Sequence, residues 1–368
     1  MDCLEWKGMF IVEKRRIVYL DALRILACLC VIYMHINERG QYMFAYREIG
    51  SALYFAEMFI SMFTKMAVPV FFAISGALML HRQMDLKTLW QKKILRIGTV
   101  LALFSAIVYA VAAAQGHAQW GLKTFIFGLY DSTWSYSYWY LYAYLGFLMV
   151  SPVLGTLARS LGKRDFLYLL ALAFVFRSLL PGMEQLRWEG VHKLNPSLNL
   201  SCITADIVIY PLLGYYLHHR MDERECRKIA PLLIAAASLL TAAACYMTYR
   251  ETTKTWMAIH QNYHELFAPF WCAAVFAAAR GYLAGVGSQS RAAGWISRFS
   301  AYTFGVYLLH LLILQNMGPA LDAVWNALMA VHLPQAIASA VYCMAVFVIC
   351  MAPVWVIKKI PGIGKWIA

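Results

Sequence analysis

An acid, a base and an imidazole share one face of an apolar stretch near the N-terminus. Residues 16–35 are mostly apolar, yet they include Asp21, Arg24 and His35. A charge at the centre of a membrane helix costs roughly 2.5 to 3.5 kcal/mol, so Asp21 and Arg24 must face protein or water. At positions i and i+3 they can pair. The step from Arg24 to His35 is about three helical turns, or about 16 Å, which places both on one face of a helix.

Two interpretations of these polar groups are open from the residues alone. A buried ion pair between Asp21 and Arg24 can fix helix packing, with His35 at the interface, and take no part in any reaction. Ionisable groups within membrane segments are also functional candidates by default, and an imidazole titrates in the range that general-base chemistry requires.

The chain as a whole has the composition of a membrane protein. Of its 368 residues, 62% are hydrophobic and 14% are charged, whereas soluble domains contain about 45–50% apolar and about 25% charged residues. A net charge of +13 would suggest a nucleic-acid partner in a soluble chain, but here we expect none and predict membrane lipids as partners. The nine cysteines include no CxxC pair and no Cys/His metal spacing, so we expect neither a disulfide framework nor a metal site.

Apolar runs of about 20 residues predict ten membrane spans. They lie near 17–37, 53–80, 94–115, 136–156, 166–180, 203–219, 229–249, 265–285, 299–318 and 333–357. Of the 32 Lys and Arg residues, 22 fall in segments on the side of the N-terminus, 8 fall on the opposite side, and Arg24 and Lys65 fall within spans. Because Lys and Arg concentrate on the cytoplasmic side, this alternation supports the assignment.

We therefore predict an all-α integral-membrane bundle of about ten transmembrane helices, forming a single domain over residues 1–368. Both termini are expected in the cytoplasm, with an uncleaved first span and with His35 towards the outer face. Pro69, inside the unusually long second run, predicts that this run is a short helix followed by a span.

The start of the third span carries a pair of cations. Lys93 and Arg96 stand at i and i+3, so both project from one face of the predicted helix. Positive-inside topology explains them, but a fixed pair of cations at the mouth of a bundle also suits phosphate groups.

Two further patterns also leave alternatives open. In the ninth span Thr303, Tyr307 and His310 form a helical stripe, which is either ordinary packing or, together with His35, part of a polar interior. The aromatic residues of segment 134–144 form either an interfacial belt or a platform for stacking sugars.

Several segments together resemble one family, the integral-membrane acyltransferases of the acyltransferase-3 type. Leu20-Asp-Ala-Leu-Arg24 followed by His35 resembles the family's first helix, Arg/Lys-X10-His. Supporting segments are Val68-Pro-Val-Phe-Phe-Ala-Ile-Ser-Gly76, Lys92-Lys-Ile-Leu-Arg96, Trp139-Tyr-Leu-Tyr-Ala143, Gly214-Tyr-Tyr-Leu-His-His-Arg220 and Tyr302-Thr-Phe-Gly-Val-Tyr-Leu-Leu-His310. The chain departs from the family at Lys92 and Lys93, where arginine is usual.

The resemblance implies an enzyme of the cell membrane, in a bacterial inner or plasma membrane. It would move an acyl group, most often acetyl, from cytoplasmic acyl-CoA to a hydroxyl or amine of a cell-surface glycan or lipid-linked sugar. Acyl-CoA would be the donor substrate, and no cofactor would be permanently bound. The implied roles are a general base at His35, donor-phosphate binding at Arg24, Lys92, Lys93 and Arg96, orientation of Arg24 by Asp21, and lining of the channel by Tyr307 and His310.

A multi-pass transporter or flippase is the alternative, because charged groups along an interior path suit that class as well. The sequence also leaves open whether His35 deprotonates the acceptor or carries the acyl group as a covalent intermediate.

Overall fold

The computed structural model describes residues 17–181, 195, 197–198, 200–255, 264–287, 290–361 and 364–367. All regular secondary structure within these residues is helical. In chain order the elements are α1 (Val18–His35), η1 (Asn37–Arg39), η2 (Met43–Tyr46), α2 (Ala52–Thr64), α3 (Ala67–Met79), α4 (Leu86–Thr88), η3 (Leu89–Ile94), α5 (Leu95–Ala114), α6 (Leu122–Tyr130), η4 (Tyr136–Tyr138), α7 (Trp139–Ser160), α8 (Lys163–Ala173), η5 (Phe174–Leu179), α10 (Ser201–Thr204), α11 (Asp206–Tyr215), η6 (Tyr216–Arg220), α12 (Glu223–Thr255), α13 (His264–Leu283), α14 (Arg291–Ser300), α15 (Thr303–Asn316), α16 (Gly318–Ala330), α17 (Gln335–Lys359) and α18 (Gly364–Ile367).

Among the described residues, seven helices are long and apolar enough to cross a membrane. They cover Val18–His35, Ala52–Met79, Leu86–Ala114, Tyr136–Ser160, Glu223–Arg250, Leu266–Leu283 and Gln335–Lys359. The bent pair α14 and α15 makes an eighth if the two count as one span. These eight coincide with eight of the ten predicted spans.

The other two predicted spans, near 166–180 and 203–219, fall on α8 with η5 and on α11 with η6. In the described part of the chain these helices are not among the candidates for crossing a membrane, so the predicted count of ten is not confirmed. An even count of eight would keep both termini on one side, whereas seven would not. The cytoplasmic location of the termini stays a prediction.

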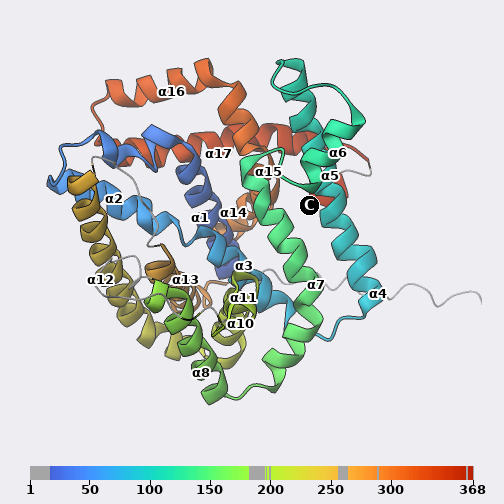
Figure 1. Cartoon of the computed structure of the whole chain (residues 1–368), viewed down its shortest axis with the longest axis vertical. Helices are drawn as coiled ribbons and strands as arrows, with labels where there is room; N and C mark the ends of the chain where they lie inside the picture. Colours follow the sequence, from blue (N-terminus) through green and yellow to red (C-terminus); the bar gives the residue numbers. More distant parts are fainter. Residues whose placement is uncertain are drawn as a thin grey trace, which may run out of the picture.

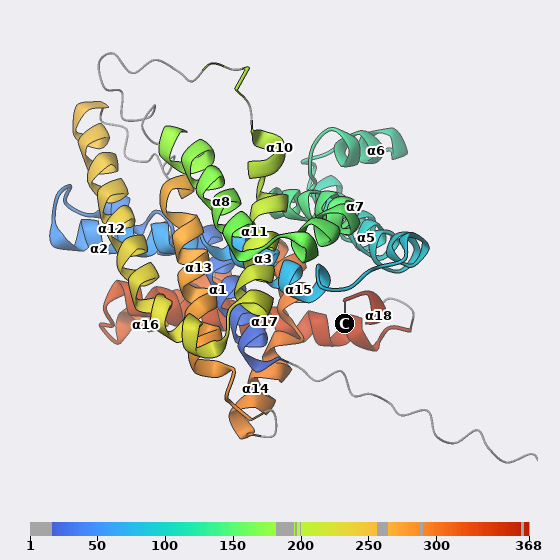
Figure 2. The same ribbon diagram turned by 90° about the horizontal axis from the view of Figure 1, so that it is seen from below.

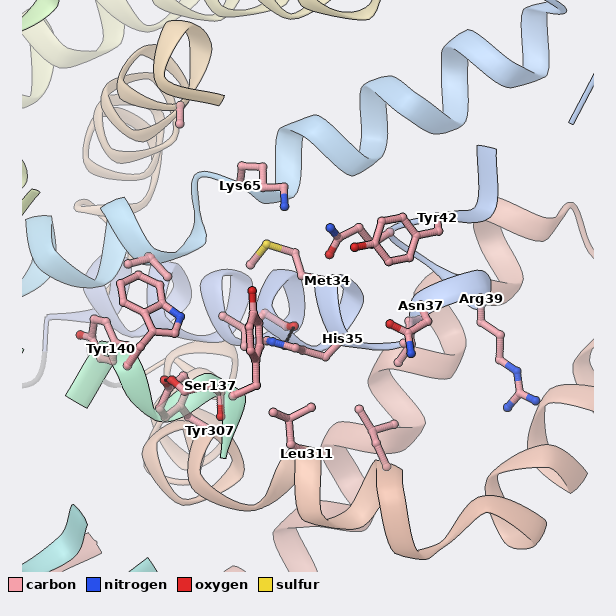
Figure 3. A pocket seen from close by; sticks show the side chains of 18 of the residues that line it. Met34, His35, Asn37, Arg39, Tyr42, Lys65, Ser137, Tyr140, Tyr307 and Leu311 are labelled. Carbon is pink, nitrogen blue, oxygen red and sulfur yellow. Dashed lines mark hydrogen bonds between the residues drawn. The ribbon is translucent and has the colours of Figure 1, made fainter. Parts of the chain in front are cut away.

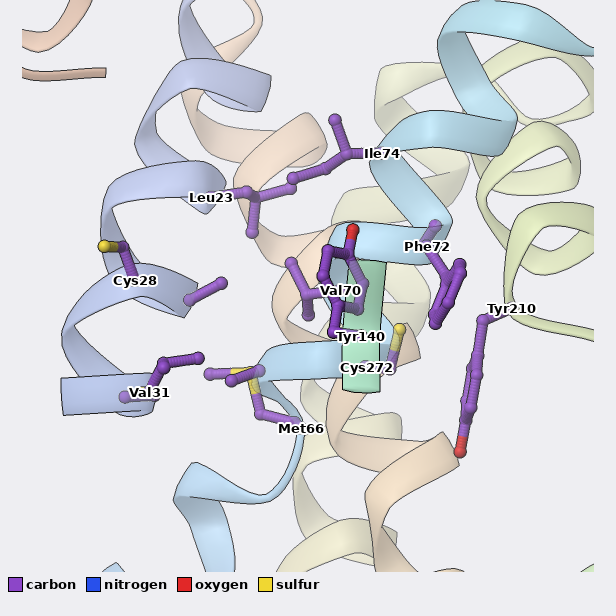
Figure 4. Packing of buried hydrophobic residues seen from close by; sticks show 14 of the residues in the cluster. Leu23, Cys28, Val31, Met66, Val70, Phe72, Ile74, Tyr140, Tyr210 and Cys272 are labelled. Atoms are coloured by element: carbon purple, nitrogen blue, oxygen red, sulfur yellow. The ribbon is translucent and has the colours of Figure 1, made fainter. Parts of the chain in front are cut away.

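The first helix lies at the centre of the molecule. It contacts α2, α3, α13, α14, α15 and α17, with α12 and α13 on one side of it and α5 and α7 on the other (Figures 1 and 2). Leu23 and Val31 of α1 point towards Ile74 and Met66, and all four side chains are buried (Figure 4). The polar groups of α1 therefore lie among other helices, as the cost of exposing them to lipid requires.

The second span is broken, as Pro69 predicts. The Ser51 hydroxyl caps α2 by accepting a hydrogen bond from the backbone N–H of Tyr54, and the helix then ends at Thr64. Because α3 begins at Ala67, Pro69 falls in its first turn, where a missing N–H costs little. Lys65 consequently lies at the break between the two helices.

Two glycines allow α3 and α11 to touch backbone to backbone. A Cβ added at Gly76 would lie well inside van der Waals distance of the Pro211 carbonyl group, and one added at Gly214 would collide with the Ala73 carbonyl group. Both glycines belong to the segments that resemble the acyltransferase-3 family. Their close contact fixes α3, and with it the wall of the cavity described below.

Candidate active site

A cavity of about 900 Å³ lies at the C-terminal end of α1. Its lining includes His35, Lys65 from the α2–α3 break, Tyr136 and Tyr140 beside the start of α7, and Tyr307 from α15 (Figure 3). Residues far apart in the sequence thus surround one half-buried imidazole. The volume is within the range of cavities that hold small molecules.

His35 pairs with His310 at the wall of this cavity. The Nδ1 atom of His35 lies 2.7 Å from the Val31 carbonyl oxygen, and Nδ1 of His310 lies 2.7 Å from the Tyr307 carbonyl oxygen. Because a carbonyl oxygen only accepts, both Nδ1 atoms carry hydrogen in the neutral rings.

The Nε2 atom of His310 must then accept, and it lies 3.3 Å from Nδ1 of His35. The Nδ1–H of His35 is therefore directed at two acceptors, the Val31 carbonyl oxygen and the His310 ring. This leaves Nε2 of His35 as the nitrogen with a free lone pair, able to accept a proton from a group in the cavity.

The partner histidine is held rigidly. His310 is fully buried, and α15 is tied to η4 by two hydrogen bonds. The Tyr307 hydroxyl donates to the Ser137 carbonyl, and the Tyr138 hydroxyl donates to the Leu308 carbonyl at 2.9 Å. Tyr307 thus lies on the cavity wall, while His310 lies behind His35.

Asp21 and Arg24 form the ion pair that their spacing predicts, with 2.6 Å between Nη1 and Oδ1. The carboxylate also accepts hydrogen bonds from Ser300 at 2.8 Å and from Ser297 at 3.2 Å. Both serines belong to α14, which packs against the first turns of α1 at one end of the molecule (Figure 2). Asp21 therefore orients Arg24, and the two serines hold the Asp21 carboxylate in place. Sequence reasoning did not identify the serines.

The three cations at the start of the third span differ in exposure and in hydrogen bonding. Lys92 is exposed and Lys93 half-buried, while Nε of Arg96 donates to the Trp366 carbonyl at 2.9 Å.

Tyr144 of α7 packs against an aromatic residue of the cavity wall. Its ring stacks on Tyr140 at 5.9 Å between centroids, and Tyr140 lines the cavity. In the described part of the chain, none of the four predicted phosphate-binding cations lines the cavity itself.

Sequence reasoning missed several charged groups that line the cavity. Lys65 lines it, and so do the ion pairs Arg39–Asp322 and Arg177–Asp206. A lysine within an apolar run is a signal that could have identified Lys65. Arg177 and Asp206 also stand within predicted apolar runs, 166–180 and 203–219, and carried the same signal. Arg39 and Asp322 carried none, and only the fold brings the two members of each pair together.

Comparison with known proteins agrees with the motifs. A family model described as an acyltransferase domain, that of the acyltransferase-3 family, matches residues 17–355. No curated protein and no solved structure matches the chain. The chain therefore belongs to the acyltransferase-3 family, a family of membrane acyltransferases.

Proposed function

We propose that this protein transfers an acyl group, in the first instance acetyl, from acyl-CoA to a hydroxyl or amine of a glycan or lipid-linked sugar. The observation that carries the proposal is the His35–His310 pair at the cavity wall. Its hydrogen bonds leave Nε2 of His35 as a proton acceptor, and a thioester is already activated, so a positioned base is the main chemical requirement.

The donor side of the proposal rests on Arg24, Arg96 and Lys93. Cations suit the phosphates of CoA, and Arg24 is about 16 Å from His35 along the helix axis. An extended pantetheine arm spans a separation of this size. We place this arm along the stacked rings of Tyr144 and Tyr140, because Tyr140 lines the cavity.

The acceptor side rests on the lining of the cavity. Tyr136 and Trp139 both line it and are exposed, which suits stacking on sugar rings. The ion pairs Arg39–Asp322 and Arg177–Asp206 add hydrogen-bonding groups around the same space. A polyhydroxylated acceptor matches this mixture of aromatic and polar surface better than a wholly apolar one.

In the proposed step, Nε2 of His35 takes the proton of the acceptor hydroxyl while the acceptor oxygen attacks the thioester carbonyl carbon. The tetrahedral intermediate then expels CoA as a thiolate, which receives the proton from the His35 imidazolium. His310 accepts a hydrogen bond from His35 throughout and acts as a positioning residue.

The test is transfer of labelled acetyl from acetyl-CoA into the glycan fraction of membranes at matched protein levels. His35→Gln is expected to reduce transfer by about 10² to 10⁴, because glutamine cannot accept a proton near neutral pH. His310→Gln is expected to cause a smaller loss. His117→Gln, at an exposed position, serves as the matched control and should retain wild-type activity.

Wild-type transfer by His35→Gln would show that His35 is not the base. If wild-type membranes transferred nothing to any glycan fraction but moved a solute across the membrane, the transporter alternative would replace this proposal.

A further inference from the structure

Lys65 is a charged residue inside the second candidate span. It follows α2 directly and lies at the break before α3, within the apolar segment Ala52–Met79. A lysine at the centre of a membrane helix costs roughly 2.5 to 3.5 kcal/mol. Such residues usually face a polar interior and are functional candidates by default.

The cavity accounts for the position of Lys65. Its half-buried side chain points from the break into the same space that His35 lines (Figure 3). A lysine and the imidazole to which we assign the proton transfer therefore line one cavity.

Acyl transfer gains from a hydrogen-bond donor near the reacting carbonyl for a reason other than proton transfer. When the acceptor oxygen bonds to the thioester carbon, the carbonyl π electrons move onto the carbonyl oxygen and make it an oxyanion. Donors fixed in advance within a water-poor site stabilise this charge far more than they would in water. An ammonium group has three N–H donors, so Lys65 can keep a protein partner and still donate to the substrate.

We propose that the Lys65 ammonium group stabilises the oxyanion formed from the donor thioester opposite His35. Lys65 donates a hydrogen bond to the carbonyl oxygen as the acceptor oxygen bonds to the carbonyl carbon. It transfers no proton. When the C–S bond breaks, the electron pair on oxygen restores the carbonyl, and the thiolate takes the proton held by His35. This role rests on the proposed function.

A structural or substrate-binding lysine would behave differently from an oxyanion-binding one. Loss of an interaction made only in the transition state lowers kcat and leaves KM largely unchanged, whereas loss of ground-state binding raises KM. A different side chain that keeps both the positive charge and N–H donors should also retain part of the rate. These contrasts define the experiment.

The experiment measures kcat and KM for acetyl transfer by wild type, Lys65→Met and Lys65→Arg. Lys65→Met keeps the length and loses the charge, and we expect kcat to fall by about 10² to 10³, the effect of removing one oxyanion donor. Lys65→Arg is expected to recover part of this loss. Lys123→Met, at an exposed position on α6, is the control and should match wild type.

Binding of two CoA analogues separates a lost oxyanion contact from misfolding. S-ethyl-CoA has no carbonyl group and should bind wild type and Lys65→Met equally. Trifluoroacetonyl-CoA forms a tetrahedral hydrate one carbon further from sulfur than the thioester carbonyl, within reach of the same donor, and should bind Lys65→Met more weakly than wild type. Equal loss of both analogues, or raised KM at wild-type kcat, would overturn the oxyanion role.

The two proposals fail in distinguishable ways. If wild type is active and Lys65→Met keeps the wild-type kcat, the role of Lys65 is wrong and the acyltransferase proposal stands. If wild type transfers no acyl group to any acceptor, the proposed function fails and the role of Lys65 fails with it.

Discussion

At the scale of single residues, backbone carbonyl groups determine the tautomers of His35 and His310. The carbonyl oxygens of Val31 and Tyr307 each accept from an Nδ1 atom, which fixes both histidine tautomers without a carboxylate. A positive charge formed on His35 would still have two acceptors at Nδ1–H. The arrangement supplies the orienting role that an acidic residue has in many hydrolases.

A prediction at this scale concerns the donor cations. Lys93→Ala should raise KM for acyl-CoA by roughly tenfold or more, because a hydrogen bond to a charged group contributes about 1.5–3 kcal/mol. Arg96→Ala should add to the effect, although Arg96 also holds the Trp366 carbonyl. The measurement is the acyl-CoA dependence of the transfer rate in membranes with matched expression.

Lys87→Ala is the control for the donor cations, because Lys87 is basic and exposed on the adjoining helix α4. It should leave KM unchanged. Unchanged KM in Lys93→Ala with Arg96→Ala would instead assign both residues to positive-inside topology alone.

At the scale of elements, breaks and bends position the site more than long straight helices do. The break at Lys65 brings a cation to the cavity. Because of the 51° bend between them, α14 contacts the first turn of α1 and α15 contacts its last residue. Ser300 contacts Asp21 near its first turn, while His310 contacts His35 at its last residue.

The crossing of α3 and α11 yields a stability prediction. Gly214→Ala should destabilise the protein by at least about 1–3 kcal/mol, the usual cost of overpacking, because its methyl group meets the Ala73 backbone rather than a flexible side chain. Thermal unfolding in detergent and elution on gel filtration are the measurements. Activity should fall as well, since α3 carries part of the cavity wall.

Gly98→Ala is the matched control in α5, where an added Cβ meets nothing within 4 Å. Alanine favours a helix over glycine by about 1 kcal/mol, so this variant should be as stable as wild type or more so. Equal unfolding temperatures for Gly214→Ala and wild type would contradict the close contact of the two helices.

At the scale of the whole molecule, the orientation in the membrane is open to direct measurement. The loop charges place Cys202 towards the outer face and segment 220–228 in the cytoplasm. Cys202 is exposed, but Cys226, the natural probe of that segment, is fully buried. Arg224 is exposed in the same segment and is the better position for an introduced cysteine.

In intact cells, a membrane-impermeant maleimide should label Cys202 and should not label Arg224→Cys in a Cys202→Ser background. The reason is that the reagent reaches only the outer face. Permeabilised cells provide the control, because both sites should then react. Labelling of Arg224→Cys alone in intact cells would invert the predicted topology.

The sequence by itself determined the membrane class, seven to eight of the spans, the broken second run, the Asp21–Arg24 pair and the family. Each of these depends on local information: apolar run length, the positions of basic loops, helical periodicity, or a motif along the chain. The cost of placing charge in lipid ties such patterns directly to structure. That His35 and Arg24 share a face of one helix follows from periodicity in the same way.

Only the tertiary structure decided which distant groups meet. His310 lies 275 residues from His35, and Ser300 lies 279 residues from Asp21. Helical periodicity identifies the inward face of each helix, but not which neighbour that face meets or at what height. The relative heights of the helices depend on contacts between separate helices. Examples are the backbone contact of Gly214 with Ala73 and the bend before α15.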